Sequence, residues 1–349
     1  MLFVRTSAMG DIVHCLPTLV ALRRAVPEAR VGWVVESTWA PILEGHPDIE
    51  QLIRVRTKAW RRGVRRAETR GEIRAAVAAM RAFRADVALD LMGNHKGAIL
   101  TRLAGAKRSV GASRRERREP SSALWLRETH PVGGEHAVDR ALGLLAPLGV
   151  EPGPADFGGD RLLADEPSAA SALLATRRGG RPLVLLQLGA GWANKIYPMD
   201  RWTEVARGLE QAGAEVWIPT APGEEHLAME VEGASEGAAR AVDATDFAVL
   251  AALMRRASLL IGGDTGPVHL AHALGTPVLS LIGPTDPKRN GPYAAAEQVL
   301  FHELPCSYCY KRFDGPRACL LQITVDEVLE RALEQLGAAE DINSKGRIQ

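Results

Sequence analysis

The chain has 349 residues, of which 46% are hydrophobic and 24% charged, with a formal net charge of +1. This length favours two domains, the balanced charge gives no global signal for nucleic acid, and no segment approaches the roughly 20 apolar residues of a membrane-spanning helix. Because there are only four cysteines and Met1 leads directly into an apolar segment, we expect a reduced, cytoplasmic protein without a cleaved leader.

The first half of the sequence alternates short apolar runs with helical patterns. Residues 2–4 predict a strand, and apolar side chains then recur at helical spacing over 12–25. Two further strands are predicted at 31–35 and 87–91, with an Arg- and Ala-rich helix over 68–83 between them. Strands separated by helices indicate a parallel sheet and an α/β fold.

A change of composition divides the sequence. Residues 156–180 are rich in Pro, Gly, Ala and acidic side chains and predict a linker. Four more buried strands follow at 183–188, 215–218, 259–261 and 278–282. The predicted organisation is a Rossmann-like domain over 1–155, a second over 181–325, an amphipathic helix over 326–340 and a polar tail over 341–349.

The loop after the first strand ends in a carboxylate. Gly10 permits a tight turn, and Asp11 stands at or beside the start of the next helix. Loops at the carboxyl ends of parallel strands bind ligands in open α/β sheets. Asp11 either caps backbone N–H groups or acts as a general base, and its position alone leaves both roles open.

A second candidate loop is Gly262-Gly-Asp-Thr-Gly-Pro-Val-His269, which follows the strand at 259–261. Pro267 suits the first turn of a helix, and no bulky side chain covers the amides around Thr265 and Gly266. Such a helix start binds phosphate. Asp264 and Thr265 are caps in the alternative interpretation, but two glycines and a proline are more than a cap needs.

A third candidate loop, Gln187-Leu-Gly-Ala-Gly-Trp-Ala-Asn-Lys195, also follows a predicted strand. Its small residues would let a nucleotide approach the backbone, and Lys195 would neutralise a departing diphosphate. A single G-x-G is weak evidence, and Lys195 could be a solvated side chain. The presence of the other two candidate loops supports a ligand-binding role for this one.

Residues 54–84 carry eleven Lys or Arg side chains against two Glu. Solvated helix faces usually alternate charges, so this excess favours a partner rich in phosphates or carboxylates. Nucleic acid is the weaker interpretation, since the segment has little aromatic interleaving and no known DNA-binding pattern.

Cys306, Cys309 and Cys319 have a spacing that could hold a metal ion. Only three thiolates are present, and His302 is the nearest candidate for a fourth ligand, so we favour a reduced structural loop without metal. Cys15 lies inside the first helical pattern and is expected in the core.

The segments Thr6–Pro17, Gly262–His269 and Gly283–Pro287 occur together in this chain, along with Arg118-Glu-Pro120 and His136–Arg140. In combination they resemble the heptosyltransferase family of lipopolysaccharide inner-core synthesis. The last two are similar to segments that bind the acidic acceptor in the first heptosyltransferase of that pathway.

The resemblance implies a GT-B fold, with an acceptor-binding domain and a donor-binding domain facing a cleft. It also implies a metal-independent, inverting transfer of heptose from ADP-heptose to a lipopolysaccharide inner core bearing Kdo or heptose, with no cofactor, no nucleic acid and a peripheral contact with the inner membrane. Asp11 would be the base and Lys195 the diphosphate partner. Donor binding would involve Gly10, Gly189, Ala190, Gly191, Lys195, Glu224 on the ribose, Asp264, Thr265, Gly266 and His269. The acidic acceptor would meet Lys58, Arg61, Arg62, Arg65, Arg118 and Arg140.

Two departures from the family pattern stand out. The loop before Lys195 lacks a Thr pair found in the first heptosyltransferase, and the cysteine loop is more similar to that of the second. The alternatives are another nucleotide-sugar enzyme of the same fold, such as an epimerase, a hydrolase or a transferase with a different donor, and a non-catalytic module for anionic ligands. A dinucleotide-dependent oxidoreductase is disfavoured because no G-x-G-x-x-G follows the first strand.

Overall fold

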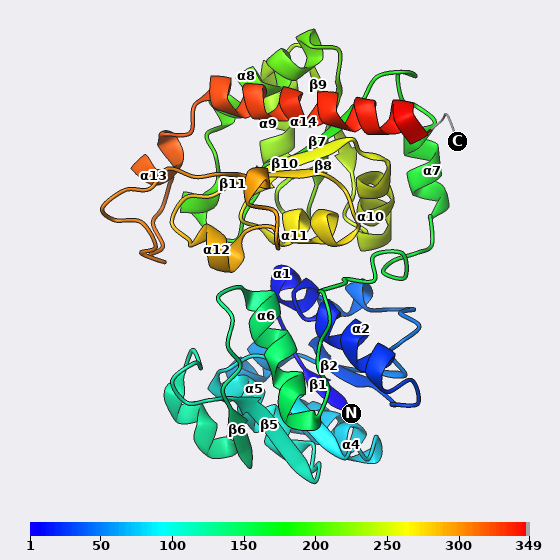
Figure 1. The fold of residues 1–349 in the computed structure, drawn as a ribbon, viewed down its shortest axis with the longest axis vertical. Coiled ribbons are helices and arrows are strands. Elements are labelled where there is room, and N and C mark those ends of the chain that lie inside the picture. Colours follow the sequence, from blue (N-terminus) through cyan, green and yellow to red (C-terminus); the bar gives the residue numbers. More distant parts are fainter. Residues whose placement is uncertain (347–349) are drawn as a thin grey trace. The chain divides into compact units, whose positions relative to one another are not determined.

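The computed structural model describes the backbone of residues 1–346 and the side chains of residues 1–337. The chain divides into two compact units, Met1–Leu163 and a second that begins at Ala164 (Figure 1). This division falls inside the predicted linker. That segment also contains a helix, α7 (Ser168–Leu174), which packs against α10 (Phe247–Arg256) of the second unit.

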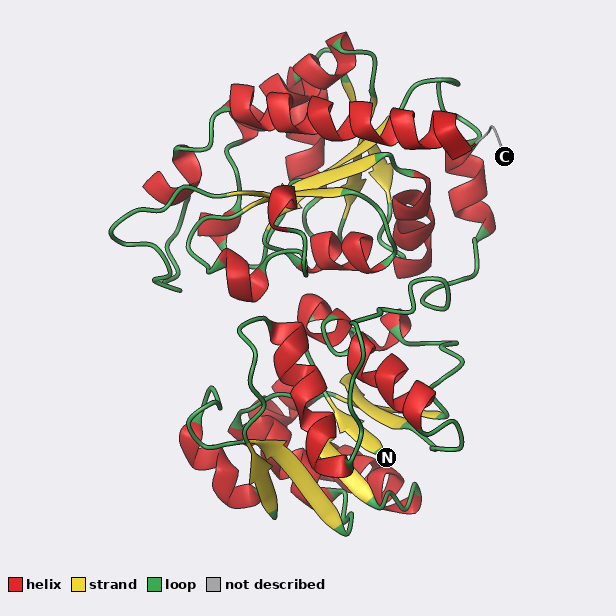
Figure 2. Ribbon diagram, viewed as in Figure 1, coloured by secondary structure: helices red, strands yellow, loops and turns green. Residues whose placement is uncertain are grey.

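The first unit is built on a sheet of six parallel strands in the order β3-β2-β1-β4-β5-β6. Helices flank its strands (Figure 2). The strands are β1 (Leu2–Val4), β2 (Gly32–Glu36), β3 (Gln51–Val55), β4 (Val87–Asp90), β5 (Arg108–Ala112) and β6 (Glu128–His130). The α-helices are α1 (Met9–Val13), α2 (Leu16–Ala25), α3 (Thr57–Gly63), α4 (Ala67–Ala82), α5 (His95–Leu103) and α6 (Ala137–Leu142).

The second unit repeats this architecture, with six parallel strands in the order β12-β11-β10-β7-β8-β9. The strands are β7 (Leu183–Gln187), β8 (Glu215–Thr220), β9 (Ala239–Asp243), β10 (Leu259–Gly263), β11 (Val278–Leu281) and β12 (Val299–Leu300). Besides α7 and α10, the helices are α8 (Met199–Gln211), α9 (Glu225–Ala234), α11 (Gly266–Ala273), α12 (Pro287–Asn290), α13 (Ala318–Leu321) and α14 (Val325–Gly346).

The central strands are buried on both faces, as continuous apolar runs predict. Every residue of β1 and of β7 is buried. In the second unit α14 packs on α8, where a Cβ at Gly208 would lie 2.6 Å from Leu329 Cδ1. Glycine at that position therefore permits the close approach of the two helices.

The structure differs from the sequence-based expectation at two helices. The single helix expected over 12–25 is two helices, α1 and α2, because Pro17 lacks a backbone N–H and occupies the first turn of α2. At the other end α14 continues past Glu340 to Gly346, into the segment expected to be a polar tail. Residues 347–349 of that segment lie outside the described residues.

Candidate functional site

Each sheet has a point where the direction of strand connection reverses: between β1 and β4 in the first unit, and between β7 and β10 in the second. Open α/β sheets bind ligands outside the carboxyl ends of the strands at this point. The loop with Asp11 follows β1, and the loops with Lys195 and Asp264 follow β7 and β10. The predicted site residues of each unit therefore gather at the edge where a ligand is expected.

Asp11 is held by a largely buried arginine. The Arg5 guanidinium forms an ion pair with Asp11 and also donates to the carbonyl oxygen of Leu91, just after β4. Burial alone would lower the pKa of Arg5, but the charge of Asp11 raises it above its ordinary value. The Asp11 side chain nevertheless remains 48% exposed. This carboxylate is fixed in direction and still accessible.

Asp11 also fulfils the capping role considered above. Its Oδ2 accepts a hydrogen bond from the backbone N–H of Ala8, at 3.2 Å, where α1 begins. Capping and exposure coexist, because one carboxylate has enough lone pairs for a cap, an arginine and a further partner. The capping contact therefore does not exclude a role as base.

A second charged group, Lys96 at the start of α5, lies beside the Asp11 loop. Its Nζ is 3.3 Å from Ser7 Oγ and 3.8 Å from Glu36 Oε1 at the end of β2. Burial lowers the pKa of Lys96, and the nearby charges of Arg5 and Lys58 contribute to this shift. Arg5 and Lys96 thus both lie beside the loop that carries Asp11.

The predicted acceptor-binding residues fall into two groups. Lys58, Arg61, Arg62 and Arg65, in or just after α3, are exposed. Helix α3 begins at the carboxyl end of β3, where the backbone N–H of Thr57 donates to Glu36. Arg118 is also exposed, whereas Arg140 is partly buried and donates to the carbonyl oxygen of Glu116. Arg140 therefore already has a structural contact.

In the second unit Lys195 and Asp264 meet in a buried ion pair. Lys195 Nζ lies 2.6 Å from Asp264 Oδ2, which also accepts from Thr285 Oγ1 at 2.6 Å. His269 Nε2 lies 3.3 Å from the other carboxylate oxygen. Burial would raise the pKa of Asp264, but His269 and Lys195 together hold that pKa below its ordinary value. Asp264 is therefore ionised, and it fixes Lys195 at the switch point.

Thr265 begins α11 without a side-chain cap, and its Oγ1 is buried. No hydrogen-bond partner for that oxygen is present among the residues the structure describes. Gly266 and Pro267 follow in the first turn, as the sequence predicts for a phosphate-binding helix start.

Glu224, at the end of the loop after β8, lies against the glycine-rich loop after β7. A Cβ at Gly189 would come 1.8 Å from Glu224 Oε2, whereas one at Gly191 would meet nothing within 4 Å. Burial raises the pKa of Glu224. Only glycine at 189 leaves room for this carboxylate, so the two predicted donor-binding positions are neighbours.

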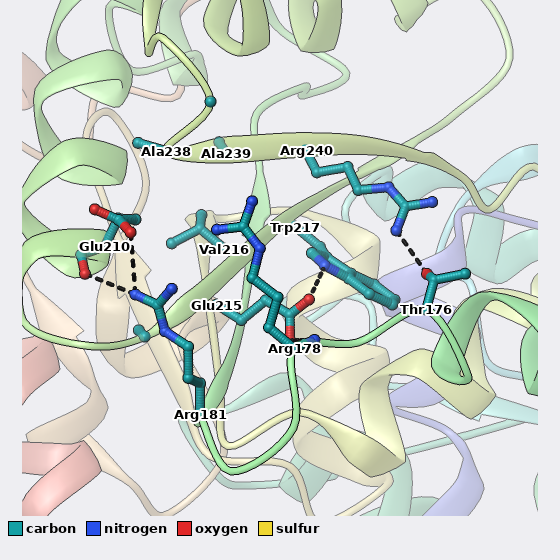
Figure 3. A pocket seen from close by; sticks show the side chains of 12 residues that line it. Thr176, Arg178, Arg181, Glu210, Glu215, Val216, Trp217, Ala238, Ala239 and Arg240 are labelled. Carbon is teal, nitrogen blue, oxygen red and sulfur yellow. Dashed lines mark hydrogen bonds and ion pairs between the residues drawn. The ribbon is translucent and has the colours of Figure 1, made fainter.

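A pocket of about 270 Å³ lies away from these residues (Figure 3). It surrounds the first residues of β8 and β9, at the amino ends of the strands, whereas the predicted site residues follow the carboxyl ends. Its charged side chains are largely paired: Arg181 donates to Glu210, and Arg240 donates to Thr176. The pocket contains none of the predicted site residues.

The cysteine loop shows no metal centre. Within the described part of the chain, no three His, Cys, Asp or Glu side chains are grouped so that they could hold a metal ion. His302, the candidate fourth ligand, instead pairs with Glu327 at 2.9 Å. Cys15 is buried as expected, and burial raises the pKa of its thiol to about 12. Among the described helices, none has the length and apolar character needed to cross a membrane.

Comparison with known proteins identifies the family of this chain. The family model described as glycosyltransferase family 9 (heptosyltransferase) matches residues 73–316. The chain belongs to this family. Lipopolysaccharide heptosyltransferase 1 of Pseudomonas aeruginosa is 33% identical over 316 residues, 89% of this chain and 86% of that protein. Its namesake in Escherichia coli K12 is 30% identical over 346 residues, 95% of this chain and 98% of that protein.

The fold agrees with that of solved heptosyltransferases. Escherichia coli heptosyltransferase WaaC with ADP has a TM-score of 0.80 to this chain at 27% identity, covering 96% of this chain and 99% of that one. The predicted GT-B class, with two Rossmann-like units, is confirmed, and the chain is a glycosyltransferase.

Several charged or polar residues at the two sites were not predicted. In this family 9 chain Arg5 orients Asp11, Lys96 and Glu36 lie beside it, and Thr285 binds Asp264. Lys96 follows a predicted strand closely, so the rule used for the glycine-rich loops could have found it. Arg5 and Thr285 also lie just after predicted strands, but their partners are set by tertiary structure, which the sequence pattern does not reveal.

Proposed function

We propose that this chain transfers heptose from ADP-heptose to the Kdo- or heptose-bearing inner core of lipopolysaccharide, with inversion at the anomeric carbon and without a metal ion. Two relatives, 33% and 30% identical to this chain, are named lipopolysaccharide heptosyltransferase 1. The similar structure of WaaC contains ADP. The observation that carries the proposal is the half-exposed Asp11 carboxylate, which the largely buried Arg5 holds at the switch point of the first unit.

In this mechanism Asp11 takes the proton from an acceptor hydroxyl as its oxygen attacks the anomeric carbon. The bond from that carbon to the diphosphate breaks, and ADP leaves. Proton removal of this kind accelerates a reaction by about a hundred- to ten-thousandfold. Lys195 stabilises the charge on the leaving diphosphate, and Asp264 fixes Lys195 and contacts the donor sugar. Gly10, next to Asp11, would be among the residues that contact the donor.

The remaining donor contacts follow from the second unit. Thr265 Oγ1 and the amides of Thr265 and Gly266 would bind phosphate, while Gly189, Ala190 and Gly191 leave space for the nucleotide. Glu224, next to Gly189, would accept hydrogen bonds from the ribose hydroxyls. His269 would act through Asp264, which it orients from within the core.

The acceptor would bind through charge. Lys58, Arg61, Arg62, Arg65 and Arg118 are exposed, and together with the partly buried Arg140 they would meet the Kdo carboxylates and lipid A phosphates. Because that acceptor is a lipid, the proposal includes a peripheral contact of a cytoplasmic enzyme with the inner membrane. The linker at 156–180 would separate the acceptor-binding and donor-binding domains.

Mass spectrometry of the reaction products tests this function. Kdo-lipid A incubated with enzyme and ADP-heptose should gain the mass of one heptose residue and release ADP, whereas parallel reactions with other nucleotide sugars should not transfer. Transfer from another donor would correct the substrate. Release of free sugar or an isomerised donor would indicate a hydrolase or an epimerase, and no reaction with any nucleotide sugar would contradict the enzymatic role.

A further inference from the structure

A loop outside the predicted site lies across the donor loops of the second unit. Residues 301–317 connect β12 to α13. The backbone N–H of Tyr310 donates to the carbonyl oxygen of Pro284, after β11, at 3.1 Å. Asn194 Nδ2, after β7, donates to the carbonyl oxygen of Lys311 at 3.0 Å. Residues 310 and 311 are therefore hydrogen-bonded to the loops after β11 and β7, the two strands that flank β10.

Trp192 brings the next residue of this loop close to Lys195. The Nζ of Lys195 lies over the Trp192 ring, 4.7 Å from its centroid, and the Cζ of Arg312 lies 4.6 Å from the same centroid. Cations are attracted to the face of an indole ring at such distances. One aromatic side chain thus holds two cationic groups in the same neighbourhood.

The two cations differ in how far their charge is compensated. Lys195 is paired with ionised Asp264 at 2.6 Å, so the pair has almost no net charge. Arg312 is exposed, and no carboxylate within ion-pair distance of it is present in the described part of the chain. A diphosphate is multiply negative, and a lysine that is already neutralised attracts it weakly. An uncompensated guanidinium, which can bind two oxygens at once, is better suited.

We propose that Arg312 is a second cation of the donor site and binds the diphosphate of the nucleotide-sugar donor beside Lys195. This inference rests on the proposed function and deepens it. Arg312 would strengthen donor binding and stabilise the charge that develops on the diphosphate as the sugar leaves. Trp192 would hold the guanidinium in place, and the Asn194–Lys311 hydrogen bond would fix the loop.

Isothermal titration of the full-length protein with ADP and with adenosine tests this proposal. Arg312→Gln should weaken ADP binding about tenfold, the effect expected for loss of one hydrogen bond to a charged group, and leave adenosine binding unchanged. Arg312→Lys should restore part of the ADP affinity. Arg317→Gln is the matched control, because Arg317 lies in the same loop over the Phe313 ring, and it should bind ADP as the unaltered protein does.

Two results would overturn the inference alone. In the first, the unaltered protein binds ADP and Arg312→Gln binds it equally well. In the second, Arg312→Gln loses ADP and adenosine affinity to the same degree, which would mean that Arg312 only supports Trp192. If the unaltered protein has no affinity for ADP, the proposed function fails as well, so the two failures are distinguishable.

Discussion

Lys195 and Asp264 lie 69 positions apart in the sequence and form an ion pair of 2.6 Å, with side chains only 13% and 5% exposed. Two buried charges are costly to desolvate, and replacing such a pair by apolar groups often costs no stability. Here Thr285 and His269 also contact the carboxylate oxygens of Asp264. This ion pair lies at the switch point of the sheet, where ligands bind, and its two charges are costly to desolvate. Ligand binding therefore explains the pair better than stability does.

Asp264→Asn should lower the free energy of unfolding by about 3–5 kcal/mol at neutral pH, because it leaves Lys195 buried without its partner. The pKa of Asp264 in the folded protein is below its ordinary value of about 3.9. The stabilisation is therefore fully present above about pH 4 and is lost as the pH falls from there toward the folded-state pKa.

Chemical unfolding of both proteins across a pH series measures this difference, which should shrink below about pH 4. Asp86→Asn serves as the control, since Asp86 pairs with Lys107 at the surface and its loss should change stability little. A difference between the Asp264→Asn and unaltered proteins that is the same at every pH would contradict the assigned ion pair.

Thr285→Val should reduce the free energy of unfolding by about 1.5–3 kcal/mol, because a buried hydroxyl that donates to an ionised carboxylate is lost. Thr285→Ser keeps the donor and should recover most of this stability. Urea unfolding of the two variants checks the assignment. Equal stability of the valine and serine variants would show that the hydroxyl contributes nothing.

The Gly189→Ala variant should displace the Glu224 carboxylate, which occupies the space of the new methyl group. If Glu224 holds the ribose, the affinity for ADP should fall about tenfold, as for loss of one charged hydrogen bond. Gly233→Ala in α9 is the control, since its methyl group would enter open space outside the proposed site. Equal ADP affinities of the two variants, measured by titration calorimetry, would argue against this placement of Glu224.

The double variant Arg61→Ala, Arg62→Ala should raise the KM for the lipid acceptor and leave the KM for the donor unchanged, because both arginines are exposed in the first unit. Arg54→Ala is the comparison, since Arg54 already pairs with Glu44. The effect should decrease at high salt. Steady-state kinetics with each substrate varied would refute the assignment if the donor KM rises instead.

The sequence predicts the centre of each sheet better than its edges. Continuous apolar runs identify the inner strands, such as β1, β7 and β10. The strands β3, β5, β6 and β9 were not predicted, because charged side chains such as Arg54, Arg108 and Arg240 interrupt their apolar pattern. β3, β6 and β9 are edge strands and partly solvated, so hydrophobicity alone does not reveal them. β5 lies inside the sheet, but Arg108, Ser109 and Gly111 leave it without a continuous apolar run.

The site was predictable loop by loop, though its internal contacts were not. Turns that contain glycine follow the strands and lead separately to Asp11, Lys195 and Asp264. They can be recognised in the sequence because the backbone geometry of such turns favours glycine. No local pattern indicates that Lys195 pairs with Asp264 or that Arg5 directs Asp11. Such contacts depend on which loops the strand order brings together.

The role of Asp11 is tested most directly by the rate of heptose transfer in Asp11→Asn, measured at saturating ADP-heptose and acceptor alongside the ADP affinity of the same variant. The amide keeps the size of the side chain and removes the base. The account predicts ADP affinity close to that of the unaltered protein and a rate lower by about a hundred- to ten-thousandfold. A variant that still transfers heptose at nearly the original rate would contradict it.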